Sequence, residues 1–93
     1  MKLPKSIKIK GEVWKIKLVD NLHAPDGDKV QGYCFTTGRE IYIDKSLRGE
    51  QLSITYLHEI NHAIMFELHL TLNLEVEEII ADGFASVYEK LFF

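Results

Sequence analysis

The sequence predicts an α+β fold in which a twisted sheet of about four strands is followed by two helices. Apolar residues alternate with lysines through the first twenty residues, which is typical of half-buried strands. Apolar residues recur at helical spacing from Gln51 to Leu68, and again after Asn73. A chain of 93 residues suits one small domain, so we expect residues 1–93 to form a single unit.

The expected strands form two pairs, and each pair is joined by a turn that contains glycine. They are Ser6–Lys10, Glu12–Val19, Val30–Thr36 and Arg39–Asp44. Gly11 marks the first turn, Thr37-Gly38 marks the second, and Pro25-Asp26-Gly27 lies in the loop between the pairs. The run Ile41-Tyr42-Ile43 is continuously apolar, which predicts a strand that is covered on both faces.

The second half of the chain is predicted to be helical. Asp44 or Ser46 is expected to cap a short helical start, and the first long helix is expected from about Glu50 to Leu68. Asn73 is expected to cap the second helix, because acidic residues follow it near the positive end of the helix dipole. That helix should reach about Leu91, with a buried stripe formed by Ile79, Ile80, Phe84, Val87 and Leu91.

Composition excludes several classes of protein. The net charge of −3 and the lack of a polybasic run give no reason to expect nucleic acid as a partner. No apolar run is long enough to cross a membrane. The single cysteine, Cys34, cannot form an internal disulfide, which favours a reducing cytoplasm. Composition leaves the oligomeric state open.

The stretch His58-Glu59-Ile60-Asn61-His62 carries the strongest chemical signal. Residues four apart on a helix lie on one face, so His58 and His62 can bind one metal ion together. Glu59 lies beside them, where a carboxylate can take a proton from a metal-bound water. This is the H-E-x-x-H pattern of zinc-dependent peptidases, and it lies inside a predicted helix, as the pattern requires.

A catalytic zinc site usually needs a third protein ligand. His69 is a poor candidate, because on a continuing helix it would lie about 10 Å along the axis from His62. Glu78 fits better, since it shares a helical face with Asp82, which could accept the ring N–H of a ligating histidine. Glu77 is the nearest competitor, but the residue four positions later is alanine, so Glu77 lacks such a partner. The acidic residues could also serve only the helix dipole.

These features resemble the gluzincins, and most closely the minigluzincins and the ImmA/IrrE-like peptidase domain of bacteria and phages. The matching residues are His58, Glu59, His62, Glu78, Ala81, Asp82, Phe84 and Ala85. Asn61 departs from the family, which often has glycine there. The resemblance implies a ββββαα core, bound Zn²⁺, hydrolysis of peptide bonds, Glu78 as the third ligand and Asp82 as the carboxylate that orients a ligating histidine.

The expected function is therefore that of a zinc metallopeptidase acting on a peptide or protein, with Glu59 as the general base for a zinc-activated water. In zincins the edge strand precedes the interior strand, so the expected substrate rim is Gly32, Tyr33, Cys34, Phe35 and Thr36. Gly32 would leave room for the substrate backbone. Two alternatives are a zinc-stabilised binding or regulatory module without catalysis, and a latent peptidase blocked by a partner or by its own terminus. For the apolar tail Leu91-Phe92-Phe93, helix-end packing or an oligomer contact is the favoured interpretation.

The group that stabilises the oxyanion is not identified by the sequence. The candidates are Tyr33, Tyr42, Tyr56, Tyr88, His23 and His69. Cys34 could contact the metal as a thiolate, but a free cysteine that packs in the interior is the favoured interpretation.

Overall fold

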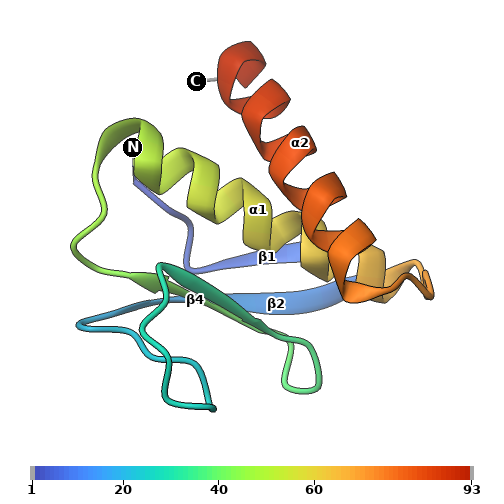
Figure 1. Ribbon diagram of the computed structural model, residues 1–93, viewed down its shortest axis with the longest axis horizontal. Coiled ribbons are helices and arrows are strands. Elements are labelled where there is room, and N and C mark those ends of the chain that lie inside the picture. Colours follow the sequence, from blue (N-terminus) through green and yellow to red (C-terminus); the bar gives the residue numbers. More distant parts are fainter. Residues whose placement is uncertain (1, 93) are drawn as a thin grey trace.

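Four strands and then two helices follow one another along the chain, as predicted (Figure 1). The computed structural model describes residues 2–92, with side chains described for residues 2–89. The elements are β1 (Ser6–Ile9), β2 (Glu12–Val19), β3 (Gly32–Phe35), β4 (Glu40–Asp44), α1 (Gly49–Glu67) and α2 (Leu74–Phe92). No helix among the described residues is long and apolar enough to cross a membrane.

The strands form one mixed sheet in the order β1-β2-β4-β3. Lys10 and Gly11 both have positive φ and form the predicted two-residue hairpin turn between β1 and β2. β3 and β4 form the second antiparallel pair, and the two pairs join through parallel pairing of β2 with β4. β3 is therefore an edge strand and β4 an interior strand, in the arrangement expected from the sequence.

The core lies between α1 and one face of the sheet. Trp14, Ile41 and Ile43 are fully buried on that face, where Tyr56 and Ala63 of α1 pack near them. The expectation that β4 is covered on both faces is wrong at its central residue. Tyr42 points to the opposite face and is only half-buried, because both helices lie on the other side of the sheet (Figure 1).

The two ends of α1 are defined by different local structures. The expected short helical start is absent, because the Asp44 carboxylate instead accepts hydrogen bonds from the backbone N–H and hydroxyl of Ser46 and forms a turn. At the other end His69 adopts φ +56°, and the N–H of Leu70 bonds to the carbonyl of Met65. This left-handed residue closes the helix as in a Schellman motif. His69 therefore terminates α1 and does not continue the helical face that carries His58 and His62.

A buried carboxylate holds the C-terminal end of α1 to the sheet. Glu67 Oε2 accepts a hydrogen bond from Trp14 Nε1 at 2.7 Å and another from Arg39 Nε at 2.7 Å. The Arg39 guanidinium lowers the pKa of Glu67, so the carboxylate stays charged. The helix that carries the two histidines is thus anchored to β2 and to the turn before β4.

α2 begins where the sequence predicted, but most of the residues predicted to form its buried stripe are exposed. The side chain of Asn73 caps the helix by accepting the N–H of Val76 at 2.9 Å. Within the described part of the chain, α2 packs on α1 and on no strand of the sheet. Its fully buried residues are the small Ala81 and Ala85. The expected stripe lies largely in solvent, with exposed fractions of 65% for Ile79, 49% for Phe84 and 53% for Val87, while Ile80 is half-buried and the Leu91 side chain lies outside the described part.

Candidate metal centre

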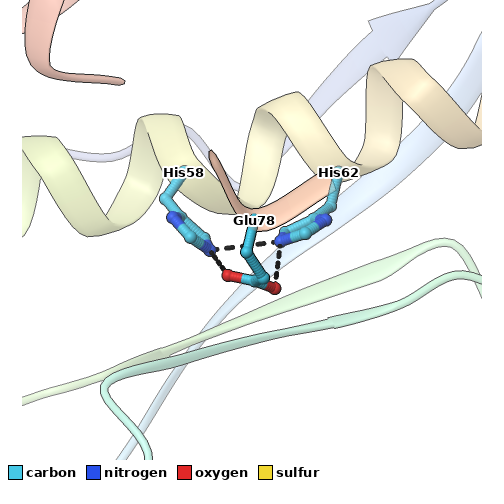
Figure 2. Close-up of side chains that lie close together, drawn as sticks. All are labelled: His58, His62 and Glu78. Atoms are coloured by element: carbon cyan, nitrogen blue, oxygen red, sulfur yellow. Dashed lines mark hydrogen bonds and ion pairs between the residues drawn. The ribbon is translucent and has the colours of Figure 1, made fainter. Parts of the chain in front are cut away.

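Three side chains from the two helices converge on one point (Figure 2). His58 and His62 project from the same face of α1, as their spacing predicted, and Glu78 reaches them from α2. The two Nε2 atoms are 3.1 Å apart. Glu78 places one carboxylate oxygen 3.1 Å from His58 Nε2 and the other 3.0 Å from His62 Nε2. These three residues are the ligands expected from the sequence.

Two further carboxylates orient the imidazole rings. Asp82 Oδ1 lies 2.6 Å from Nδ1 of His58, which is the contact expected for Asp82. Glu77 Oε1 lies 2.6 Å from Nδ1 of His62. Because a carboxylate can only accept, each Nδ1 donates its proton, and we infer that each Nε2 presents a lone pair.

The donor set fits a divalent cation of the zinc type. The two Nε2 atoms and the Glu78 carboxylate oxygens lie about 3 Å from one another, so a cation between them would contact all three side chains. Ligand atoms at ~2.0–2.1 Å from tetrahedral zinc lie roughly 3.3 Å apart, which is close to the separations found here. Two imidazoles with one carboxylate are also a known ligand set of catalytic zinc.

Glu59 is buried beside the two histidines. The side chain is 7% exposed, and this burial raises the pKa of the carboxyl to about 7 in the metal-free protein. A Cβ atom on Gly32 would lie 2.8 Å from Glu59 Oε2 and 2.8 Å from Thr55 Cγ2. The missing side chain of Gly32 therefore leaves room for the Glu59 carboxylate.

Two adjoining cavities cross the site along β3. One has a volume of about 410 Å³ and the other about 310 Å³, and both are lined by Gly32, His58 and Glu59. Four of the five expected rim residues line the larger cavity: Gly32, Tyr33, Cys34 and Thr36. The fifth, Phe35, does not line it and instead lines a cavity on the far face of the sheet with Tyr42. Tyr33 lines that far cavity as well, because residues two apart on a strand point to the same face.

The candidates for oxyanion stabilisation are mostly far from this cavity. Among the six, only Tyr33 lines it within the described part of the chain. Tyr42 donates to Glu40 on the far face of the sheet, His23 is bonded to the carbonyl of Asn21, and His69 ends α1. Tyr56 is buried in the core and Tyr88 stacks on Phe84 of α2.

Cys34 packs against the core beside the site and is a free thiol. Burial raises its pKa, and the carboxylates of Glu59 and Glu77 add to the effect. The side chain is thus held as a neutral thiol in the metal-free protein, in agreement with the packing interpretation.

Glu77 is the site residue that sequence reasoning missed. It was set aside because it has no carboxylate or histidine partner one turn later on its own helix. Its partner is His62 on the other helix. One signal was present: Glu77 and Glu78 are adjacent in α2 and lie about 100° apart around the helix axis, so each can reach a different histidine.

Comparisons with protein-family models, with curated proteins and with solved structures found no match for the chain. Any function assigned to it therefore rests on its own residues and their arrangement.

Proposed function

We propose that this chain is a zinc-dependent metallopeptidase of the gluzincin type, similar to the minigluzincins, which hydrolyses peptide bonds in a peptide or protein substrate. One observation carries the proposal. Both histidines have their Nδ1 atoms hydrogen-bonded to carboxylates, so both Nε2 lone pairs point to a single position next to Glu78. A metal at that position would be held by His58, His62 and Glu78.

Bound zinc supplies a Lewis acid that lowers the pKa of a coordinated water from ~15.7 towards ~7. Glu59 supplies the proton acceptor. Its carboxyl is buried and has a pKa near neutrality, which suits a group that takes a proton and then returns it to the leaving amine. A purely structural metal site does not need such a group, so its presence favours the enzyme over the non-catalytic module.

The substrate is proposed to bind along the outer edge of β3. The backbone groups on that side of an edge strand are free to pair with an extended peptide. The two cavities lie along this edge and meet at Glu59. An extended peptide paired with β3 would therefore bring its carbonyl groups close to Glu59 and the two histidines. The lone cysteine, a partly buried free thiol, suits the reducing cytoplasm.

Metal analysis of purified protein tests the ligands. Wild-type protein is expected to bind one zinc ion per chain, and Glu78→Ala is expected to lose it. His69→Ala and Glu75→Ala serve as controls, because the first residue ends α1 and the second is an exposed glutamate in the same turn of α2. Loss of zinc in the His69 variant with retention in the Glu78 variant would overturn the assignment.

Peptide hydrolysis tests the activity. A library of fluorogenic peptides incubated with the zinc protein should be cleaved, and Glu59→Gln should keep zinc but abolish cleavage. A variant that keeps the parental rate contradicts Glu59 as the base. A zinc protein that cleaves nothing, even after the residues following 90 are removed, favours the binding module over the latent peptidase.

A further inference from the structure

A separate cavity lies at the beginning of α1, between residues 2–5, β2 and the loop of residues 44–48. We call it the basic cavity. Its volume is about 500 Å³, which is within the range of cavities that hold small molecules. Figure 1 shows the segment before β1 starting beside the first turn of α1. None of the residues that line the basic cavity lines the two cavities at His58 and Glu59, so it is distinct from the candidate metal centre.

Much of the lining of the basic cavity is aliphatic. Five leucine and isoleucine side chains contribute to it: Leu3, Ile16, Leu18, Leu47 and Leu52. Leu18 is 53% exposed, and the other four are at least partly buried. The N–H of Ile16 donates to the carbonyl of Lys5 at 2.9 Å and so holds the first segment of the chain against β2. An aliphatic chain placed in the cavity would remove this apolar lining from water.

The same cavity carries an excess of positive charge, although the chain as a whole has a net charge of −3. Four cationic side chains line it: Lys2, Lys5, Lys45 and Arg48. Within residues 2–92 no carboxylate forms an ion pair with any of them. Asp44 is the single acidic residue of the lining. Hydrogen bonds from Ser46 and from the N–H of Leu22 lower the pKa of Asp44 to about 2, so its carboxylate is already satisfied by neutral donors.

Arg48 is held in a position that suits a carboxylate. Its Nη1 atom donates to the carbonyl oxygens of Lys45 and Leu47, both at 2.8 Å. Its Nε and Nη2 atoms have no acceptor in the part of the chain that the structure describes. These two nitrogens form the edge of a guanidinium that can donate two parallel hydrogen bonds to one carboxylate. Two backbone carbonyls therefore fix the side chain, while the edge that binds anions stays free.

We propose that the basic cavity binds a single-chain carboxylate, such as a fatty acid of about eight to twelve carbons, with its chain on the aliphatic lining and its head at Arg48. The excess of positive charge and the free edge of Arg48 favour an anionic head. The aliphatic lining favours an attached chain over a free anion, because a small hydrated anion gains nothing from apolar surface. The proposal does not depend on the metal or on peptidase activity.

Calorimetric titration of the full chain with hexanoate, octanoate and decanoate tests the binding and its dependence on chain length. The dissociation constant of decanoate is expected to be of the order of 100 µM. It should rise about fourfold for each CH₂ that is removed, because each buried CH₂ contributes to the affinity. Decyltrimethylammonium, which has a similar chain and the opposite charge, should bind at least about tenfold more weakly. Decanoate at about ten times its dissociation constant should raise the melting temperature by about 5–10 °C.

Substitutions separate the site of the head from the site of the chain. Arg48→Met should weaken decanoate binding by at least about tenfold without weakening decyltrimethylammonium, whereas Leu18→Thr should weaken both ligands. The double variant Lys5→Gln with Lys45→Gln keeps Arg48 and should weaken decanoate by about three- to tenfold. Lys8→Gln is the matched control, since Lys8 is an exposed lysine of β1 outside the cavity; it should leave decanoate binding unchanged.

Backbone amide shifts in NMR spectra locate the ligand. Decanoate should shift the amides of Leu3, Leu18 and Leu47 and leave that of Gly32 on β3 in place. The proposal is overturned if decanoate gives neither heat nor shifts at about 5 mM, or if decyltrimethylammonium binds as tightly as decanoate. Shifts that concentrate along β3 overturn it equally. An equal loss of affinity in Lys8→Gln and Arg48→Met also overturns it, because the effect would then come from net charge and not from the cavity.

Discussion

Replacement of Gly32 by alanine is the sharpest test of how the site is built. The added Cβ would lie 2.8 Å from Glu59 Oε2, 2.8 Å from Thr55 Cγ2 and 2.9 Å from Glu59 Cγ, where ordinary contacts begin at 3.4 Å. The strand or the Glu59 carboxylate must therefore move by at least 0.6 Å. Overpacking of this kind costs about 1–3 kcal/mol, and alanine returns about 0.5–1 kcal/mol of backbone entropy.

The net loss is expected to be roughly 1–2 kcal/mol, which lowers the melting temperature of a domain this small by about 4–16 °C. Thermal and urea unfolding of the metal-free protein measure it. If Glu59 is the general base, a displacement of about 0.6 Å should also slow peptide cleavage by roughly tenfold or more, while zinc stays bound.

The same substitution in a double variant that lacks the contacting atoms separates the steric clash at Gly32 from other effects of alanine. Thr55→Ser with Glu59→Ala removes all three close atoms and keeps the hydroxyl of residue 55. In that background Gly32→Ala should no longer destabilise, and a small gain of about 0.5 kcal/mol is expected. The reasoning is refuted if Gly32→Ala unfolds at the wild-type midpoint, or if its cost is equal in the two backgrounds.

Three further predictions concern the same helices. Glu77→Gln and Asp82→Asn should each weaken zinc binding by about 10–100-fold, measured by competition with a chelator, and Glu75→Gln should not. Burial raises the pKa of Glu59 from 4.5 to about 7, so the folded metal-free chain keeps a proton that the unfolded chain loses, and its stability should fall by at most roughly 3 kcal/mol as pH rises from 4.5 to 7. Urea titrations at both pH values should show that Glu59→Gln lacks this loss; an equal fall in both proteins would contradict it. Ala85→Leu should lower stability by about 1–3 kcal/mol, because the residue is fully buried between α1 and α2; an unchanged urea midpoint would argue against close helix packing.

Much of the site could be predicted because its signals are local. Residues four apart on one helix share a face whatever the rest of the chain does, so the pairing of His58 with His62 followed from their spacing. The same rule placed Glu78 and Asp82 together. The Asn73 cap and the Gly11 turn also depend only on residues close in sequence, and both are confirmed.

The face that α2 turns inward could not be predicted from periodicity. Apolar spacing shows that a helix has an apolar side, but it does not show that this side meets the core. In α2 the inward side carries Ala81 and Ala85, which allow α1 to approach, and acidic residues that reach the histidines. The more apolar side, which carries Ile79 and Val87, is left in solvent.

The sequence alone determined the order of elements, the two histidines, the carboxylates that face them on α2 and the candidate base. Only the tertiary structure decided that Glu77 orients His62 and that Gly32 makes room for Glu59. The physical reason is the same in both cases. These contacts join elements distant in the chain, and they exist only because the parallel pairing of β2 with β4 and the packing of α2 on α1 bring those elements together.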